Sequence, residues 1–98
     1  MIRHILLIKF KASAKPSEIE KLKGLFASMP DKMDGVLSVE WGENDSSEGK
    51  NQGYSHSVLM TFSDEKGRQN YLPHPEHEVL KKVFRPLLED IVVFDYTI

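Results

Sequence analysis

The segment from Tyr71 to His77 is the part of the chain whose residues could do chemistry. It reads Tyr-Leu-Pro-His-Pro-Glu-His and holds two of the four histidines and two of the five prolines. Pro75 suits the first position of a helix, and it pushes His74 towards an extended backbone. His77 then falls in the first helical turn, where the helix dipole favours a neutral imidazole that can accept a proton. A kink that holds Tyr71 and His77 a few residues apart on an apolar segment is a candidate site.

Two other interpretations of this segment involve no catalysis. The first is a capped helix start whose histidines are satisfied by hydrogen bonds, and spacing alone favours it. The second is a metal site made of His74, His77, Glu78 and His56. Because Pro75 turns the two neighbouring histidines in different directions, we expect no metal here.

The composition is that of one small globular domain. With 98 residues, 40% hydrophobic and 29% charged, we predict a single domain over residues 1–98. A net charge of -2 gives no basic face for nucleic acid. No apolar run approaches the ~20 residues of a membrane span, and residues 1–8 indicate a strand rather than a signal peptide. Since cysteine is absent, we expect no disulfide, and a cytoplasmic location is the default expectation.

The first half of the chain predicts a strand, a helix and a second strand. Residues 2–10 alternate as a strand, and residues 36–41 form the next one. The helix between them begins near Ser17, which has capping-box spacing to Glu20, and Pro30 ends it. Its apolar stripe, core with a minor ligand-lining role in the last turn, is Ile19, Leu22, Leu25, Phe26 and Met29. The second strand places on one face Leu37, Val39 and Trp41.

The second half predicts a polar loop, a strand, two helical pieces and a last strand. The loop covers residues 42–53, and the third strand covers residues 54–62. Ser63 caps a short helix over residues 64–72, and a second helical piece follows the kink and restarts at Pro86. Residues 91–98 form the last strand, with one face made of Val92, Phe94, Tyr96 and Ile98.

This order of elements is typical of an α+β, ferredoxin-like βαββαβ fold, a four-stranded antiparallel sheet with helices on one face. We expect the helices on the more apolar face, which holds Ile2, Leu6, Ile8, Phe10, Val58, Met60, Phe62, Val92 and Phe94. The other face holds Ile5, Leu7, Leu59, Thr61, Ile91 and Val93. Left in water, these side chains would form a larger apolar patch than monomers usually tolerate. We therefore predict an obligate homodimer packed sheet to sheet.

The predicted packing brings polar side chains to one cavity. His4 and His56 lie on the helix-covered face of the sheet, and Tyr71 and His77 lie on the helix above it. His4 and His56 are offset by about four residues on neighbouring strands, roughly 13 Å. They therefore lie at opposite ends of a pocket, or one of them is only a core histidine.

The chain resembles the stress-responsive A/B barrel (Dabb) family from end to end. The segments that carry the resemblance are Arg3-His4, Val39-Glu40-Trp41-Gly42, Gly53-Tyr54-Ser55-His56, Tyr71 to His77 and Val92-Val93-Phe94-Asp95-Tyr96. The resemblance implies a dimeric α+β barrel. A plant member of the family closes a linear poly-β-ketone by aldol condensation without metal or cofactor. Its catalytic tyrosine and histidine correspond to Tyr71 and His77, and its pocket histidines correspond to His4 and His56.

Two functions of different classes follow. In the first, which we favour because a fold does not imply its function, an inner pocket binds a small apolar or aromatic ligand without reaction. The residues expected to line that pocket are His4, His56, His74, Phe26, Met29 and Trp41. In the second, His77 abstracts an acidic α-proton from a β-keto substrate while Tyr71 donates a hydrogen bond to the enolate oxygen. The basic residues Lys81, Lys82 and Arg85 are expected to form an exposed helix face.

Overall fold

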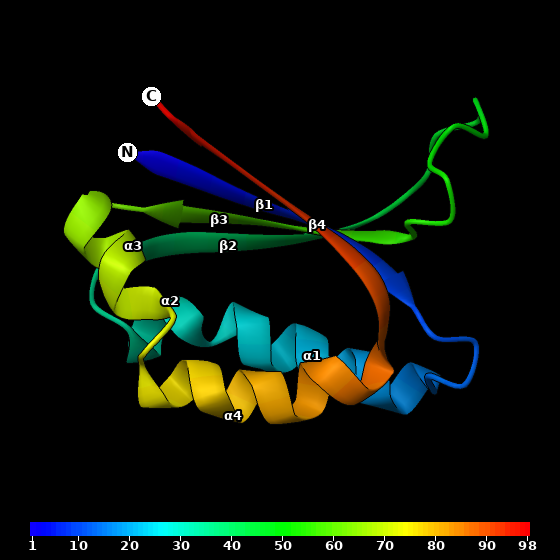
Figure 1. The fold of residues 1–98 in the computed structure, drawn as a ribbon, viewed down its shortest axis with the longest axis horizontal. Helices are drawn as coiled ribbons and strands as arrows, with labels where there is room; N and C mark the ends of the chain where they lie inside the picture. The colour runs from blue at the N-terminus through cyan, green and yellow to red at the C-terminus, as the bar shows by residue number, and fades with distance from the viewer.

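Four antiparallel strands form one sheet in the order β2-β3-β1-β4 in the computed structural model, which describes residues 1–98. The strands are β1 (Ile2–Phe10), β2 (Val36–Glu43), β3 (His56–Phe62) and β4 (Leu88–Thr97). The helices are α1 (Pro16–Ala27), α2 (Met29–Lys32), α3 (Glu65–Tyr71), α4 (Pro75–Phe84) and the 3₁₀ turn η1 (Arg85–Leu87). Figure 1 shows α1 and α4 side by side below the sheet, whose other face is left bare. The predicted ferredoxin-like architecture is confirmed.

The core lies between the sheet and the two long helices. Every second residue of β1 and β3 faces the helices, as strand alternation requires. The fully or nearly buried members of this face are Ile2, Leu6, Ile8, Val58, Met60 and Phe62. From α1 and α4 they meet Leu22, Phe26, Leu80 and Phe84. The predicted helix-facing residues of β1 and β3 are thus confirmed.

The predicted faces of the last strand are wrong. In the register of β1 with β4, Leu6 lies opposite Val93 and His4 lies opposite Asp95. Ile91, Val93 and Asp95 therefore share the helix side, and Val92, Phe94 and Tyr96 lie on the bare side. Both faces of this strand are apolar, so alternation alone could not say which one faces the core.

The second strand contains an irregularity that the sequence did not reveal. Val36 pairs with Phe62 and Ser38 with Thr61, so the register shifts around Leu37. Val36 is buried, whereas Leu37 is 53% exposed, which corrects its predicted place beside Val39 and Trp41. A bulge of this kind turns one residue out of the alternation.

The start and end of the first helix differ from the prediction. The helix begins at Pro16, and the side chain of Glu18 accepts a hydrogen bond of 3.0 Å from the Lys15 N–H. The carboxylate that closes the first turn is therefore Glu18, not Glu20. Pro30 does not end α1 but lies in the first turn of α2, where a proline is tolerated.

Two later boundaries also differ. Asp64, not Ser63, caps α3, since its carboxylate accepts a hydrogen bond of 2.8 Å from the Gly67 N–H. Pro86 lies in the 3₁₀ turn η1 rather than restarting an α-helix, and β4 begins at Leu88, three residues before the predicted Ile91. None of the helices has the length and hydrophobicity that crossing a bilayer requires.

Candidate functional site

The junction of α3 and α4 places the candidate pair. Tyr71 ends α3, and His74 is the N-cap of α4, with Nδ1 accepting a hydrogen bond of 3.1 Å from the Glu76 N–H. Pro75 occupies the first helical position, as predicted. His77 consequently lies in the first turn of α4, facing back towards the end of α3.

Tyr71 lies at the centre of a cluster of aromatic rings. Its ring centroid lies 4.6 Å from that of His77, 5.4 Å from Phe62 and 5.8 Å from His4. His4 and Phe62 also contact each other at 5.6 Å. Three of the polar rings picked out in the sequence are thus brought together, from β1, α3 and α4.

His77 is held as a neutral imidazole. Burial lowers the pKa of His77, and the positive charge of Lys81 lowers it further. Glu78 and the carbonyl of Leu72 raise this pKa, and Arg85 lowers it, with the net shift downward. Nδ1 of His77 is buried and has no hydrogen-bond partner in the chain. A buried nitrogen without a partner is costly, so a ligand atom that bonds it would be favoured.

Tyr71 is held as a neutral phenol. Burial raises the pKa of Tyr71 far above its ordinary value, because a buried phenolate would lose its hydration. The phenol therefore acts as a hydrogen-bond donor at neutral pH. A donor next to a neutral imidazole is an arrangement suited to binding a carbonyl or hydroxyl, and also to moving a proton.

His4 has its own polar partners on the neighbouring strand. Its Nδ1 lies 2.7 Å from Oδ1 of Asp95, and Oδ2 of Asp95 lies 3.4 Å from Nη1 of Arg68. Because an ionised carboxylate only accepts hydrogen bonds, Nδ1 of His4 is the donor. Asp95 fixes the orientation of the imidazole as well as its tautomer.

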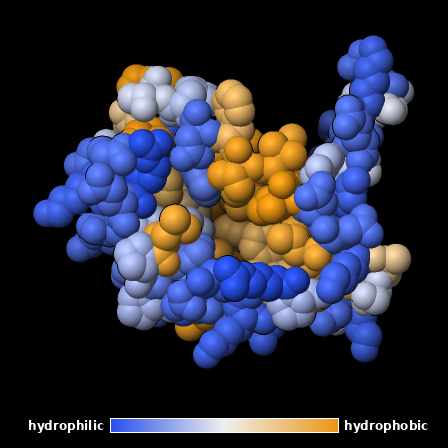
Figure 2. All heavy atoms as spheres, in the orientation of Figure 1, coloured by the Kyte–Doolittle hydropathy of each residue, from blue (hydrophilic) through white to orange (hydrophobic).

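These side chains lie at one end of an apolar cavity of about 480 Å³. In Figure 2 hydrophobic atoms line a hollow between the helices and the sheet, and hydrophilic atoms surround it. Ten of its sixteen lining residues are hydrophobic, and they come from strands β1, β3 and β4, from helices α1, α3 and α4, and from the link between α3 and α4. The apolar walls include Leu6, Phe26, Leu80, Phe84, Ile91 and Val93. Of the residues predicted to line a pocket, the cavity contains His4, Phe26, Tyr71 and His77.

His56 and Trp41 lie away from this cavity. His56 pairs with Ile8, four positions along β1 from His4, so the offset expected from the sequence is present. Its ring contacts Phe10 and Trp41 at centroid distances of 5.0 and 5.4 Å, and its Nδ1 lies 2.7 Å from Oγ of Ser55. His56, the other histidine that lies on a strand, is thus separated from the Tyr71 cluster.

His74 and Met29 are also outside the cavity. His74 caps α4 and borders a separate surface depression with Lys32 and Asp34. Met29 is 1% exposed within the hydrophobic core. No three histidine, aspartate or glutamate side chains gather closely enough to hold a metal ion.

The charged cavity residues were not expected in the site from the sequence: they are Arg68, Lys81, Arg85 and Asp95. Asp95 was assigned to the bare face of the sheet relative to His4, because the faces of β4 were interchanged. In the observed register Asp95 lies opposite His4, so the correct register of β1 with β4 would have been enough to predict the His4–Asp95 pair. Arg68 lies one turn before Tyr71 on α3, which is the spacing of neighbours on one helix face.

The comparisons with known proteins agree with this architecture. The sequence profile of the stress responsive A/B barrel domain family (Dabb) matches residues 2–98. The stress-response A/B barrel domain-containing protein HS1 of Arabidopsis thaliana is 30% identical over 95 residues, covering 97% of this chain and 87% of that protein. The olivetolic acid cyclase of Cannabis sativa is 28% identical over 96 residues, covering 98% of this chain and 95% of the cyclase. The chain belongs to the Dabb family.

Solved structures share the fold. The crystal structure of At3g17210 from Arabidopsis thaliana superimposes with a TM-score of 0.92 at 30% identity, covering 100% of this chain and 95% of that chain. A hydroxynitrile lyase from Passiflora edulis superimposes with a TM-score of 0.91 at 23% identity, covering 99% and 92%. A ferredoxin-like protein from Thermobifida fusca, described as dimeric, has a TM-score of 0.84 at 23% identity and covers 99% and 90%.

Proposed function

We propose that the chain forms a homodimer in which each subunit binds one small ligand with an apolar or aromatic body. The body occupies the cavity between α4 and β4, and a carbonyl or hydroxyl group of the ligand meets Tyr71 and His77. The observation that carries this proposal is the apolar cavity of about 480 Å³ with its polar groups gathered at one end. Small-molecule sites are typically clefts of ~300–1,000 Å³ with mostly apolar walls and a few convergent polar groups.

The polar groups of the cavity support a ligand rather than a closed internal network. The hydroxyl of Tyr71 makes no hydrogen bond within the chain, and Nδ1 of His77 is buried without a partner. The cavity thus offers one donor and one acceptor to a bound molecule. His4 differs from them, because Asp95 already holds one of its nitrogens.

Isothermal titration of the protein with para-butylphenol tests the proposal, and we expect saturable binding with one ligand per subunit. Val93 lines the cavity and is 57% exposed, so Val93→Trp should fill the entrance without disturbing the core and weaken binding at least tenfold. Val79→Trp is the matched control, because Val79 is 46% exposed on α4 and does not line the cavity. Equal affinity in both variants, or no binding to the wild type, would count against a ligand site here.

A second function, cofactor-independent carbon–carbon bond formation, is favoured by the contact of Tyr71 with a neutral His77. A relative of 28% identity is named olivetolic acid cyclase. In this reaction His77 removes a proton next to a ketone while Tyr71 donates a hydrogen bond to the enolate oxygen. The enolate carbon then attacks a second carbonyl of the same chain, and the protonated His77 returns its proton to the alkoxide that forms. Incubation with a linear poly-β-ketone thioester distinguishes the two functions. Conversion that is lost in both His77→Gln and Tyr71→Phe supports the enzyme, whereas binding without conversion supports the ligand-binding protein alone.

A further inference from the structure

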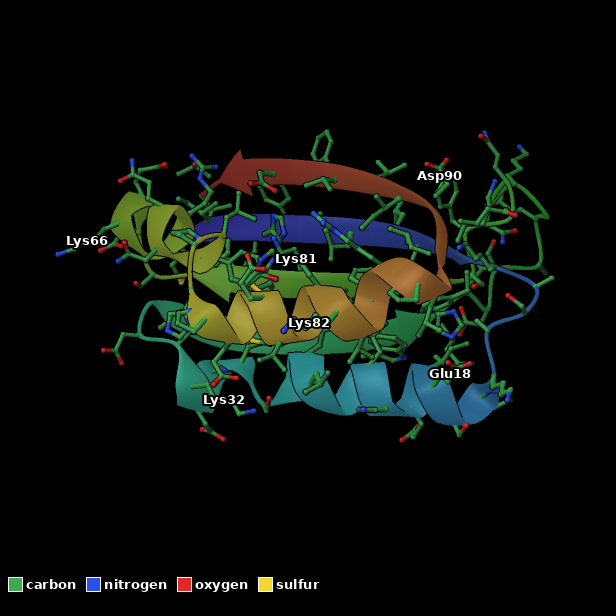
Figure 3. The ribbon with its side chains drawn as sticks, turned by 60° about the horizontal axis from the view of Figure 1, so that its bottom comes forward. Glu18, Lys32, Lys66, Lys81, Lys82 and Asp90 are labelled. Atoms are coloured by element: carbon green, nitrogen blue, oxygen red, sulfur yellow. The ribbon has the colours of Figure 1, made fainter.

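The rim of the cavity carries an excess of positive charge. Arg68, Lys81 and Arg85 all line it, against the single carboxylate of Asp95. That carboxylate is already bonded to His4 and to Arg68. Lys81 lies between α4 and the sheet in Figure 3, whereas its neighbour Lys82 lies nearer α1. Lys82 and Arg85 are exposed, as expected of a basic helix face, whereas Lys81 is half-buried.

The cations differ in how firmly their charges are already paired. Arg68 bonds both Glu65 and Asp95. Lys81 pairs with Glu78 at 2.7 Å, but the Glu78 side chain is 55% exposed, and exposed pairs of this kind contribute little stability. Arg85 forms no salt bridge. Lys81 and Arg85 can therefore receive an anion from the cavity at small cost.

These two cations lie one turn apart on α4, and both line the cavity. Lys81 in turn lies one turn after His77. A ligand whose apolar body fills the cavity and whose charged group lies along this stretch of α4 would therefore meet Lys81 and Arg85. Guanidinium groups bind carboxylates in a two-pronged geometry, and an ammonium group adds a flexible second donor.

We propose that the ligand is an amphiphilic carboxylate, with its apolar body in the cavity and its carboxylate held by Lys81 and Arg85 at the rim. This inference rests on the proposed ligand-binding function and adds the charge of the ligand to it. Glu78 then releases Lys81 to the ligand. The carboxylate also offsets the positive charges around His77, so binding favours a proton on that ring.

The test compares three molecules with one body and different charge: para-butylbenzoate, para-butylbenzyl alcohol and para-butylbenzylamine. We expect isothermal titration at neutral pH to rank their affinities in that order, with the benzoate about tenfold tighter than the alcohol, as one charge-assisted hydrogen bond would give. The Lys81→Gln/Arg85→Gln double variant should lose this preference and keep its affinity for the alcohol. Lys82→Gln is the matched control and should behave as the wild type, because Lys82 is exposed and does not line the cavity.

A second readout follows the imidazole itself. In an NMR titration of the His77 Cε1–H signal, bound benzoate should raise the pKa of His77, and the bound alcohol should raise it less. Equal affinity for benzoate and alcohol, or a preference that survives in the double variant, would overturn the carboxylate assignment while leaving the ligand site intact. Failure of all three molecules to bind would overturn the ligand site together with this inference.

Discussion

His77 links the chemistry of the site to the stability of the fold. Its pKa in the folded protein lies below the ordinary value of about 6.5, mainly because of burial. Between these two pKa values the unfolded chain binds more protons than the folded chain, so stability rises with pH in that window. We therefore expect the contribution of His77 to be complete above about pH 6.5 and to be lost as the pH falls through its folded pKa. Urea unfolding of the wild type and of His77→Gln at a series of pH values measures this, and the variant should lose part of the acid sensitivity.

The cause of the shift can be tested separately. Lys81→Gln removes the second contribution to the lowered pKa, so the NMR titration of His77 in the free variant should move upward. Lys82→Gln should leave it unchanged. A His77 that titrates at its ordinary pKa in the wild type would contradict the buried, neutral state assigned to it.

The sequence predicted the centre of the site better than its rim. The proline kink and the helix start were enough to bring Tyr71 and His77 together, because proline geometry and helix capping are local. The inclusion of His4 needed only the phase of the first strand. Asp95 was missed because its position depends on the register of β1 with β4, two strands that are distant in the sequence. Both faces of β4 are apolar, so alternation did not indicate which face lies towards the helices.

At the scale of elements, two glycines allow the turn before β2 to touch α3. Gly35 has φ +91°, and a Cβ there would lie 2.7 Å from Cα of Gly67. We expect Gly35→Ala to lower the free energy of unfolding by at least about 2 kcal/mol, from backbone strain together with overpacking. Gly24→Ala in α1 is the control, since its Cβ would meet nothing within 4 Å. There the better helix propensity should raise stability by about 0.5–1 kcal/mol.

Urea unfolding followed by circular dichroism would measure both variants. A Gly35→Ala protein as stable as the wild type would show that this contact is not close in solution. The start of α3 shows why element boundaries were less predictable than element types. Asp64 rather than Ser63 caps α3, and the N–H of Ser63 donates to the carbonyl of Gly35 at 2.9 Å. Two adjacent residues could each cap the helix by sequence, and Ser63 is engaged in a tertiary hydrogen bond that a local pattern does not reveal.

At the scale of the whole molecule, the bare face of the sheet is the surface on which we propose that two copies meet. Correcting the faces of β4 moves its aromatic residues to this side, where Phe94 is 61% and Tyr96 44% exposed in the single chain. Leu7 is 40% exposed beside them. This face is therefore more apolar than the sequence alone indicates, which favours the proposed sheet-to-sheet homodimer. Since β4 also contributes Val93 and Asp95 to the cavity, the dimer contact would lie directly behind the cavity wall.

The dimer can be tested at Phe94. We expect the wild type to sediment as a dimer at micromolar concentration and Phe94→Glu to sediment as a monomer. In a two-fold dimer the same face meets its own copy, so one substitution places two carboxylates in a desolvated apolar contact. Val79→Glu is the matched control, because it charges an apolar residue of similar exposure on α4, away from the bare face. A wild type that sediments as a monomer, or a Phe94→Glu variant that stays dimeric while Val79→Glu does not, would place the interface elsewhere.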